Sequence, residues 1–420
     1  MNTTIHASSA LRIERARLID GTGAAPIDDA VLVAGDDGVI GYAGPAAGAP
    51  APAGERVIDA GGRTVLPGFF DCHVHLGFQH GRSPGRRAEE DPVLQMLGTV
   101  RRLRETLDAG ITSARDLGGL PAGFRTAVEQ GLVEGPRLQT AVRIIGHTGG
   151  HSDVRLPDGH DLSGGMSEIA DTEDEVRLAT RRVIRAGADL IKVCATGGMG
   201  SPYDQPDDEE LTEAEIRAVI DEGRRHGGRA VAAHAQGTAG IMTALRAGVT
   251  SIEHGYGMDD AACDLAGETG AFVVPTLSTV YAGINKETMP DYHYQKKIRW
   301  SGITKTNIAR VIERGLPVAL GTDAAVGPHG VNLMELSYLV DLGMTPMGAI
   351  IAGTRTASEL LGVSGRLGTL EAGKLADVVV CDGDPLRDIT VLGDPGNVVC
   401  VVQQGVVRKD LLPAPARTAA

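Results

Sequence analysis

The spacing of hydrophobic positions changes twice along the chain. From residue 11 to about 66, apolar and polar residues alternate, as in 11–19, and Asp-Gly turn signals separate the runs. From residue 67, short apolar runs alternate with stretches in which apolar residues recur every three or four positions. After Gly362 the β pattern returns, in runs such as 378–380 and 397–402. The pattern predicts β segments at both ends and alternating strands and helices between them.

The middle region is predicted to hold eight strands, each followed by helical material. Its clearest helix begins at Asp91, a capping residue followed by proline, and ends near Gly110. Thr212 and Glu215 form a capping box that opens another helix. The predicted strands are 69–76, 110–116, 137–145, 189–194, 230–234, 249–254, 271–276 and 316–323, and the predicted helices are 91–109, 171–187, 212–226, 241–247, 303–314, 333–342 and 346–361.

Eight β/α units in about 300 residues predict a closed (β/α)8 TIM barrel over residues 67–362. The β segments 1–66 and 363–411 are each too small for a core of their own, so we expect them to pair into a composite, β-sandwich-like domain beside the barrel. Residues 412–420 are predicted to be a disordered tail. An open doubly wound sheet is the alternative, but the Gly-rich dinucleotide turn typical of that fold is absent.

Composition narrows the possible partners and compartment. The formal net charge of -14 disfavours binding to phosphate backbones, so we expect no nucleic-acid partner. No signal-peptide core and no apolar run of about 18 residues is present, which predicts a soluble, cytoplasmic protein without membrane contact. Five scattered cysteines without C-x-x-C spacing indicate neither a disulfide framework nor a cysteine-based zinc site.

Ionisable residues mark the ends of five predicted strands. His73 and His75 end the first strand, and because strand residues i and i+2 share a face, their imidazoles point to one place. Taken alone, such a pair is as compatible with ordinary polar histidines as with a metal site. The further members are Lys192, His234, His254 and Asp323, all toward C-terminal strand ends, where barrel enzymes build their sites. Four imidazoles and a carboxylate suit zinc or a similar divalent metal.

Lys192 is chemically out of place in this set, because an ammonium beside metal ligands would be repelled and desolvated. Modification to a carbamate would turn it into a bidentate anion able to bridge two metals. The alternative is a structural lysine paired with Asp189 or another carboxylate.

These motifs resemble the amidohydrolase superfamily over nearly the whole chain. The resemblance rests on His73-x-His75, the Lys192 strand, His234 and His254, the 65–68 lead-in, the 321–323 Gly-Thr-Asp run and the closing stretch 365–377. The runs 146–151, 191–193 and 251–255 are similar to those of the imidazolonepropionase-like and Xaa-Pro dipeptidase-like group, which includes ochratoxin-hydrolysing amidohydrolases.

The resemblance implies a binuclear site holding two divalent ions, expected to be Zn²⁺. His73, His75 and Asp323 would bind one ion and His234 and His254 the other, with N6-carboxylysine at Lys192 bridging them. The implied activity is hydrolysis of an amide bond in a dipeptide, an N-acyl amino acid or a similar carboxylate-bearing amide by a metal-bound hydroxide, with Asp323 carrying the proton. The alternatives are a mononuclear cyclic-amide hydrolase or deaminase of the imidazolonepropionase type, and a non-catalytic barrel with a structural metal.

Candidate substrate contacts lie on the predicted loops beyond the strand ends. Arg115 and Asp116 are expected to form a structural ion pair, and Glu253 is expected to face away from His254 as a supporting or structural residue. The substrate is expected to be a small amide or peptide, and the protein a homo-oligomer. The candidate contacts are His147, His151, Tyr203, Tyr256 and His329.

Overall fold

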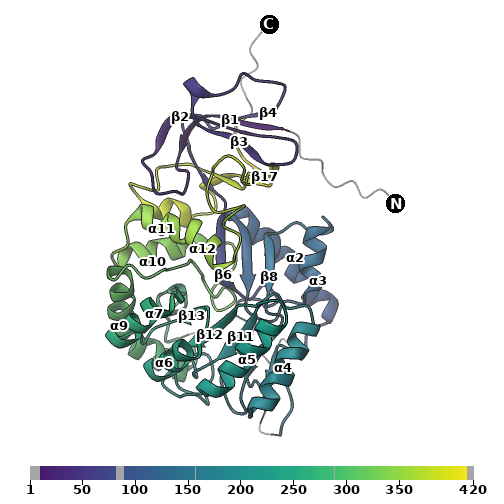
Figure 1. Ribbon diagram of the computed structural model, residues 1–420, viewed down its shortest axis with the longest axis vertical. Helices are drawn as coiled ribbons and strands as arrows, with labels where there is room; N and C mark the ends of the chain where they lie inside the picture. The colour runs from purple at the N-terminus through teal and green to yellow at the C-terminus, as the bar shows by residue number, and fades with distance from the viewer. Residues whose placement is uncertain (1–9, 82–88, 157, 288, 414–420) are drawn as a thin grey trace.

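The computed structural model describes residues 10–81, 89–156, 158–287 and 289–413. The N- and C-terminal segments lie together at the top of the molecule, and the alternating strands and helices lie below them (Figure 1). The predicted tail 412–420 lies outside the described residues from 414 onward.

One eight-stranded sheet is made from both ends of the chain. Its order is β17-β16-β15-β5-β1-β2-β3, with β4 on β1. The two ends meet where β15 runs antiparallel to β5 and Val380 lies opposite Val65. The domain boundaries expected at 66/67 and 362/363 stay predictions. The strands are β1 Leu11–Leu18, β2 Ile27–Ala34, β3 Ile40–Pro45, β4 Arg56–Asp59, β5 Thr64–Pro67, β15 Val378–Cys381, β16 Val398–Gln403 and β17 Val406–Asp410.

The middle region contains parallel strands in two sheets, β6-β7-β8 and β10-β9-β11-β12-β13-β14. Most of their residues are buried, as expected for parallel strands covered by helices. The strands are β6 Phe69–Val74, β7 Ile111–Asp116, β8 Arg137–Thr140, β9 Ile144–Gly146, β10 Ser167–Ile169, β11 Ile191–Cys194, β12 Val231–Ala235, β13 Ser251–His254 and β14 Phe272–Val274.

Backbone hydrogen bonds connect these sheets on two sides. Val273 of β14 donates its N–H to Pro317, and Cys72 of β6 donates to Leu320, so segment 317–320 lies between the two sheets. On the other side, Asp189 donates its backbone N–H to Thr140, at the end of β8. The chain therefore folds as parallel strands that alternate with helices, and the closed barrel remains a prediction.

Helices lie around the parallel strands (Figure 1). Asp91 caps α2 through Val93 N–H, and the predicted capping box of Thr212 and Glu215 at the start of α5 is confirmed. The main helices are α2 Pro92–Asp108, α4 Glu173–Arg185, α5 Glu213–Arg225, α6 Thr238–Ala247, α7 Asp260–Thr269, α9 Asp291–Glu313, α10 Glu335–Asp341, α11 Pro346–Ala352 and α12 Arg355–Leu360, with shorter helices α3 Gly123–Glu129 and α8 Ser278–Tyr281.

Four predicted elements differ from the structure. The strand expected at 316–323 is extended chain with an isolated bridge between Val318 and Val273 in place of a continuous strand. The helix expected at 303–314 begins earlier, at Asp291. Its first turns bury Lys296 and Lys297, and a pattern of apolar positions does not detect a buried lysine. The strand expected at 137–145 is split into β8 and β9, and Val142 between them has a left-handed φ of 62°. The helix expected at 346–361 breaks after α11, where a Cβ on Gly353 would come within 2.9 Å of the Phe69 ring.

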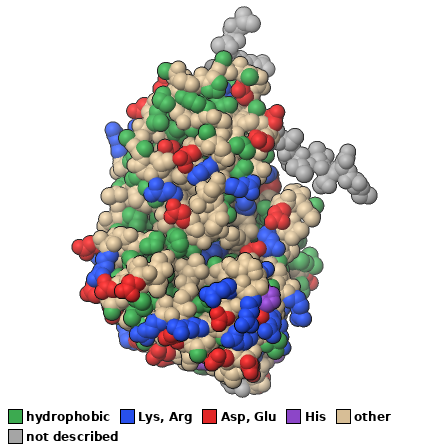
Figure 2. Space-filling view, in the orientation of Figure 1, with side chains coloured by type: hydrophobic (Ala, Val, Ile, Leu, Met, Phe, Trp, Pro, Cys, Tyr) green, Lys and Arg blue, Asp and Glu red, His purple; other side chains and the backbone are tan. Residues whose placement is uncertain are grey.

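Many basic side chains on the surface form ion pairs with nearby acidic ones. Figure 2 shows Lys and Arg side chains gathered over the lower part of one face, interspersed with acidic ones. In that part of the chain Arg181 pairs with Glu222 at 2.7 Å and Arg182 with Glu168 at 3.5 Å, linking α4 to α5 and β10. Among the described helices, none has the length and apolarity to cross a membrane.

Candidate metal centre

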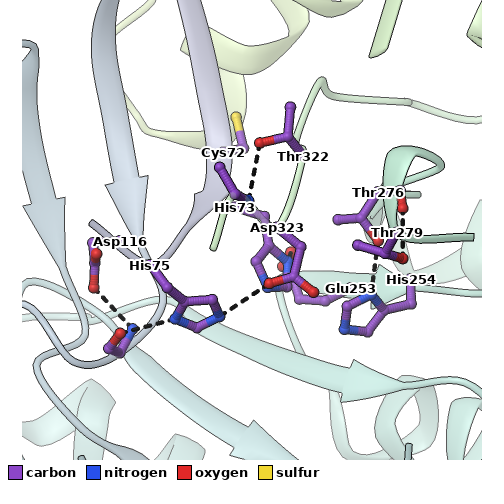
Figure 3. A network of polar contacts seen from close by, with 12 residues as sticks. Cys72, His73, His75, Asp116, Glu253, His254, Thr276, Thr279, Thr322 and Asp323 are labelled. Carbon is purple, nitrogen blue, oxygen red and sulfur yellow. Dashed lines mark hydrogen bonds and ion pairs between the residues drawn. The ribbon is translucent and has the colours of Figure 1, made fainter. Parts of the chain in front are cut away.

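Three buried side chains converge at the C-terminal ends of the parallel strands. Ligand atoms of His73, His254 and Asp323 all lie within 4.8 Å of one another. The side chains come from the ends of β6 and β13 and from the loop after segment 317–320, and Figure 3 shows them pointing toward one another. The residues are buried, at 1%, 3% and 8% exposed. Two imidazoles and a carboxylate in this geometry can hold a divalent cation.

The backbone is strained at two of these positions. His254 has a φ of 73° and Asp323 a φ of 56°, both in the left-handed region that non-glycine residues rarely occupy. Each such residue costs of order 1–3 kcal/mol and persists because its surroundings hold it. The strain turns both side chains into the cluster at the point where each extended segment ends.

Asp71 joins β6 to the segment that carries Asp323. Its carboxylate accepts hydrogen bonds from the Thr322 hydroxyl at 2.6 Å and the Asn332 amide at 2.7 Å. It also accepts the backbone N–H of His73 at 3.1 Å, and burial raises its pKa to about 6. Gly321 allows this close packing, because a Cβ there would meet Val274 at 2.3 Å.

Glu253 holds His73 from behind. The Glu253 carboxylate lies 2.8 Å from His73 Nδ1, which directs His73 Nε2 into the cluster. It also accepts a hydrogen bond from the Arg115 guanidinium at 2.7 Å, and all three side chains are at most 2% exposed. The ion pair expected between Arg115 and Asp116 is wrong, because Arg115 pairs with Glu253. Asp116 instead accepts the backbone N–H groups of Leu76 and Gly118.

The other imidazoles are oriented in the same way. His254 Nδ1 lies 2.7 Å from the Thr276 hydroxyl, and His75 Nδ1 lies 2.8 Å from the Gly118 carbonyl oxygen. In both rings Nε2 is left for the cluster, and His75 Nε2 is 3.2 Å from Asp323 (Figure 3). His234 is reversed, because its Nε2 lies 3.0 Å from the Gly197 carbonyl oxygen, and its Nδ1 has no hydrogen-bond partner among the described residues. Such partners fix the nitrogen that a metal would bind.

The charge states of three imidazoles and of Asp323 suit metal binding, whereas, against the effect of burial, Asp323 raises the pKa of His75. Burial lowers the pKa values of His73, His234 and His254 well below the ordinary value, so these imidazoles are neutral and can donate lone pairs. Burial alone would raise the pKa of Asp323, but His73 and His75 hold it below its ordinary value, so Asp323 is ionised.

Lys192 reaches the same cluster from β11. It is 2% exposed, and its Nζ has no hydrogen-bond partner among the described residues. Burial lowers its pKa, and the nearby Glu253 and Asp323 oppose that shift without cancelling it. The pairing with Asp189 that was the structural alternative is not seen, because Asp189 pairs with Arg125. An unpartnered buried ammonium is unfavourable as it stands and fits a residue that is modified in the functional protein.

A cavity of about 490 Å³ opens over the cluster. His151 lines it and stacks on His234, with ring centroids 4.3 Å apart. His151 Nδ1 lies 2.9 Å from the Asp204 carboxylate, and a Cβ on Gly198 would come within 2.4 Å of the His151 ring. The imidazole is therefore held firmly at the edge of the cluster.

The five candidate substrate contacts separate into two groups. His151 and Tyr203 line the cavity, and the Tyr203 residue is 77% exposed. His147, Tyr256 and His329 are not part of the cavity wall. Tyr256 is fully buried with its hydroxyl 2.6 Å from that of Thr279, and His329 Nε2 lies 2.9 Å from the Phe78 carbonyl oxygen.

Sequence reasoning missed several polar groups of the cavity. Ser152 and Gln236 line the wall, and each has a buried side-chain oxygen without a partner among the described residues. Arg155 also lines the wall. Gln236 stands two residues after His234, at the end of the same strand, which is the one signal that marked it in advance.

The chain is similar to known proteins over most of its length. The model of the amidohydrolase family matches residues 64–408. An ochratoxinase of Aspergillus niger is 33% identical, over 93% of this chain and 85% of that protein. An imidazolonepropionase of Xanthomonas campestris is 27% identical, over 87% of this chain and 90% of that protein. The crystal structure of a Xaa-Pro dipeptidase with bound methionine has a TM-score of 0.87 and 32% identity, and covers 95% of this chain and 99% of that one.

Proposed function

The chain belongs to the amidohydrolase family, whose members are hydrolases acting on C–N bonds, and from this premise we propose a metal-dependent hydrolase of carboxylate-bearing amides. Its substrate would be a dipeptide, an N-acyl amino acid or a similar compound, ochratoxin-type amides included. The observation that carries the proposal is the convergence of His73, His254 and Asp323 beneath a cavity large enough for such a molecule.

The proposed metal centre is binuclear. His73, His75 and Asp323 would hold one divalent ion, His234 and His254 the other, and Lys192 would bridge them as N6-carboxylysine. The donor set supports this, because His73, His234 and His254 are neutral and Asp323 is ionised. The unpartnered Nζ of Lys192 supports the bridge. Zinc is the proposed ion, since nitrogen and oxygen donors together suit it.

The chain's own residues have distinct tasks in this proposal. When bound, the ions would polarise the scissile carbonyl and lower the pKa of a water molecule. Asp323 takes a proton from the attacking water and returns it to the leaving nitrogen, a task for which an ionised, buried carboxylate is suited. His151, held by Asp204 at the edge of the cluster, lines the cavity and is placed to contact the substrate.

The surrounding architecture is part of the same proposal. A closed (β/α)8 barrel would bring all the cluster residues to one face, and the sheet made from both chain ends would form a separate module beside it. The cytoplasmic location and the homo-oligomer stay predictions from the sequence.

A second candidate is a mononuclear cyclic-amide hydrolase or deaminase, favoured by the similarity to an imidazolonepropionase. Related enzymes of that kind work with one metal and without a modified lysine. Metal stoichiometry together with the chemical state of Lys192 separates the two candidates.

A screen of dipeptides and N-acyl amino acids, with metal analysis of the same protein, tests the proposed activity. Chelation should abolish hydrolysis, and zinc, cobalt or manganese should restore it, because the attacking water depends on a divalent ion. The measurement is amine release before chelation, after dialysis and after each addition. Full activity in thoroughly demetallated protein would exclude the metal-dependent mechanism.

Glu253→Gln is expected to weaken metal binding about 10- to 100-fold, the usual effect of removing a partner that orients a ligating histidine. The amide keeps the size of the side chain but loses the charge that holds His73 and Arg115. Competition with a metal indicator measures the affinity, and circular dichroism checks folding.

Glu222→Gln is the matched control, because Glu222 is also a buried carboxylate paired with an arginine, on α5. It should leave metal affinity unchanged. Equal affinities in the wild type and Glu253→Gln would show that Glu253 does not orient His73.

A further inference from the structure

The loop after β9 contains two short segments that pair with each other, and it forms one wall of the cavity. Leu162 donates its backbone N–H to Val154 at 2.8 Å, and Leu156 donates to His160 at 2.9 Å, which pairs arm 154–156 with arm 160–162. Val154, Leu156 and Leu162 present apolar side chains to the cavity. Arg155 lines the cavity from the middle of the first arm, so a cation lies beside these apolar side chains, with Asp153 next to it in the cavity wall.

One edge of the Arg155 guanidinium is hydrogen-bonded to Asp153, and its other N–H groups are not used in this way. Its Nη1 donates to Asp153 Oδ1 at 2.7 Å, and Asp153 Oδ2 accepts the Gly149 N–H at 2.9 Å. The Asp153 side chain is 9% exposed and the Arg155 side chain 35%. Among the described residues, the Arg155 side chain makes no other hydrogen bond. A guanidinium has five N–H donors in a planar fork, so the remaining donors can bind a planar anion bidentately.

The charge distribution in the cavity singles out this group. Of the described residues that line the cavity, Arg155 and Lys192 are the Lys and Arg side chains, and Lys192 belongs to the metal cluster. His293 also lines the wall, but burial and the nearby Lys297 and Lys296 lower its pKa to about 4, so it is neutral near pH 7. A carboxylate entering the cavity therefore finds its fixed positive partner at Arg155.

We propose that Arg155 is the specificity-determining residue that binds the free carboxylate of the substrate, with Asp153 holding the guanidinium in position. The inference rests on the proposed amide hydrolysis and names its substrate class more narrowly. Because Val154, Leu156 and Leu162 flank Arg155, the preferred amide bears its carboxylate beside a bulky apolar side chain. Asp153 and Arg155 act on substrate selection and not on the bond that breaks.

The test compares two substrates that differ in one group. An N-acyl derivative of an apolar amino acid is assayed with a free carboxylate and as its carboxamide. Arg155→Met should lower kcat/KM for the acid about 10- to 100-fold, the range for losing a hydrogen bond to a charged group, mainly through KM. The carboxamide should change by less than about twofold, because it does not use the cation. Arg155→Lys should be intermediate, since an ammonium keeps the charge without the fork.

Arg17→Met is the matched control, because Arg17 is a partly exposed, ion-paired arginine on β1 of the terminal sheet. It should leave both substrates unaffected. Competitive inhibition by the amino-acid product gives a second readout, and its Ki should rise in Arg155→Met as KM does. An equal loss on acid and carboxamide, or an unchanged Ki, would overturn the inference and leave the proposed function standing. If wild-type protein hydrolyses neither compound nor any other amide in the screen, the proposed function fails and the inference with it.

Discussion

Lys192→Ala is expected to lose at least one metal ion per chain and nearly all hydrolytic activity. In the proposed centre Lys192 bridges two ions as a carbamate, so alanine removes two oxygen ligands at once. The wild-type ammonium is buried and unpartnered, and its replacement by alanine removes an unfavourable group from the fold. The loss should therefore come from the missing bridge and not from unfolding. Elemental analysis and kcat on the same preparation measure both effects.

Two further variants sharpen this expectation. Lys192→Arg should fail as badly as alanine, because guanidinium stays charged and forms no carbamate. Short carboxylic acids should partly restore Lys192→Ala by occupying the bridge. Cys194→Ala is the control, because Cys194 lines the same cavity from the same strand and should keep its metals. An unmodified, well-ordered lysine in active, metal-loaded protein would rule out the bridge and favour the mononuclear candidate.

Asp323→Asn should lower kcat by about 10²-fold or more, the scale typical of general acid–base catalysis. Asparagine nearly keeps the shape of the side chain but cannot take the proton from the attacking water. The wild-type carboxylate is ionised, since His73 and His75 hold its pKa below its ordinary value despite burial.

Metal loss would produce a similar defect, so metal content must be measured in the preparation used for kinetics. The informative sample is Asp323→Asn that retains its metals. If such a sample has nearly wild-type kcat, Asp323 is a ligand at most and the proton is carried by another group.

The positions of the cluster residues could be inferred before the fold was known, because they depend on local periodicity. His73 and His75 stand two apart at the end of an apolar run, and strand geometry puts them on one face. His254 ends another apolar run in the same way, and the structure brings it to His73 and Asp323. A strand that is covered by helices has buried, apolar positions. This pattern of apolar positions can be recognised in a single sequence.

A helix that buries charged side chains could not be predicted correctly from the pattern of apolar positions. The first turns of α9 bury Lys296 and Lys297, and Lys296 Nζ donates to the carbonyl oxygens of Gly198 and Ser201. A lysine counts as a polar position in any apolar pattern, although here its stem and ammonium are both enclosed. Helix α9 was therefore predicted to begin too late.

The sequence by itself determined the change from β segments to alternating strands and helices, the capped starts of α2 and α5, and the residue types at the strand ends. Only the tertiary structure decided how those residues are supported. Glu253 contacts His73 from 180 positions away, and Asp204 contacts His151 from 53. Arg155 enters the cavity through the conformation of its loop. Local patterns record which positions are buried, whereas a contact between distant segments depends on packing, and packing leaves no periodic trace in a single chain.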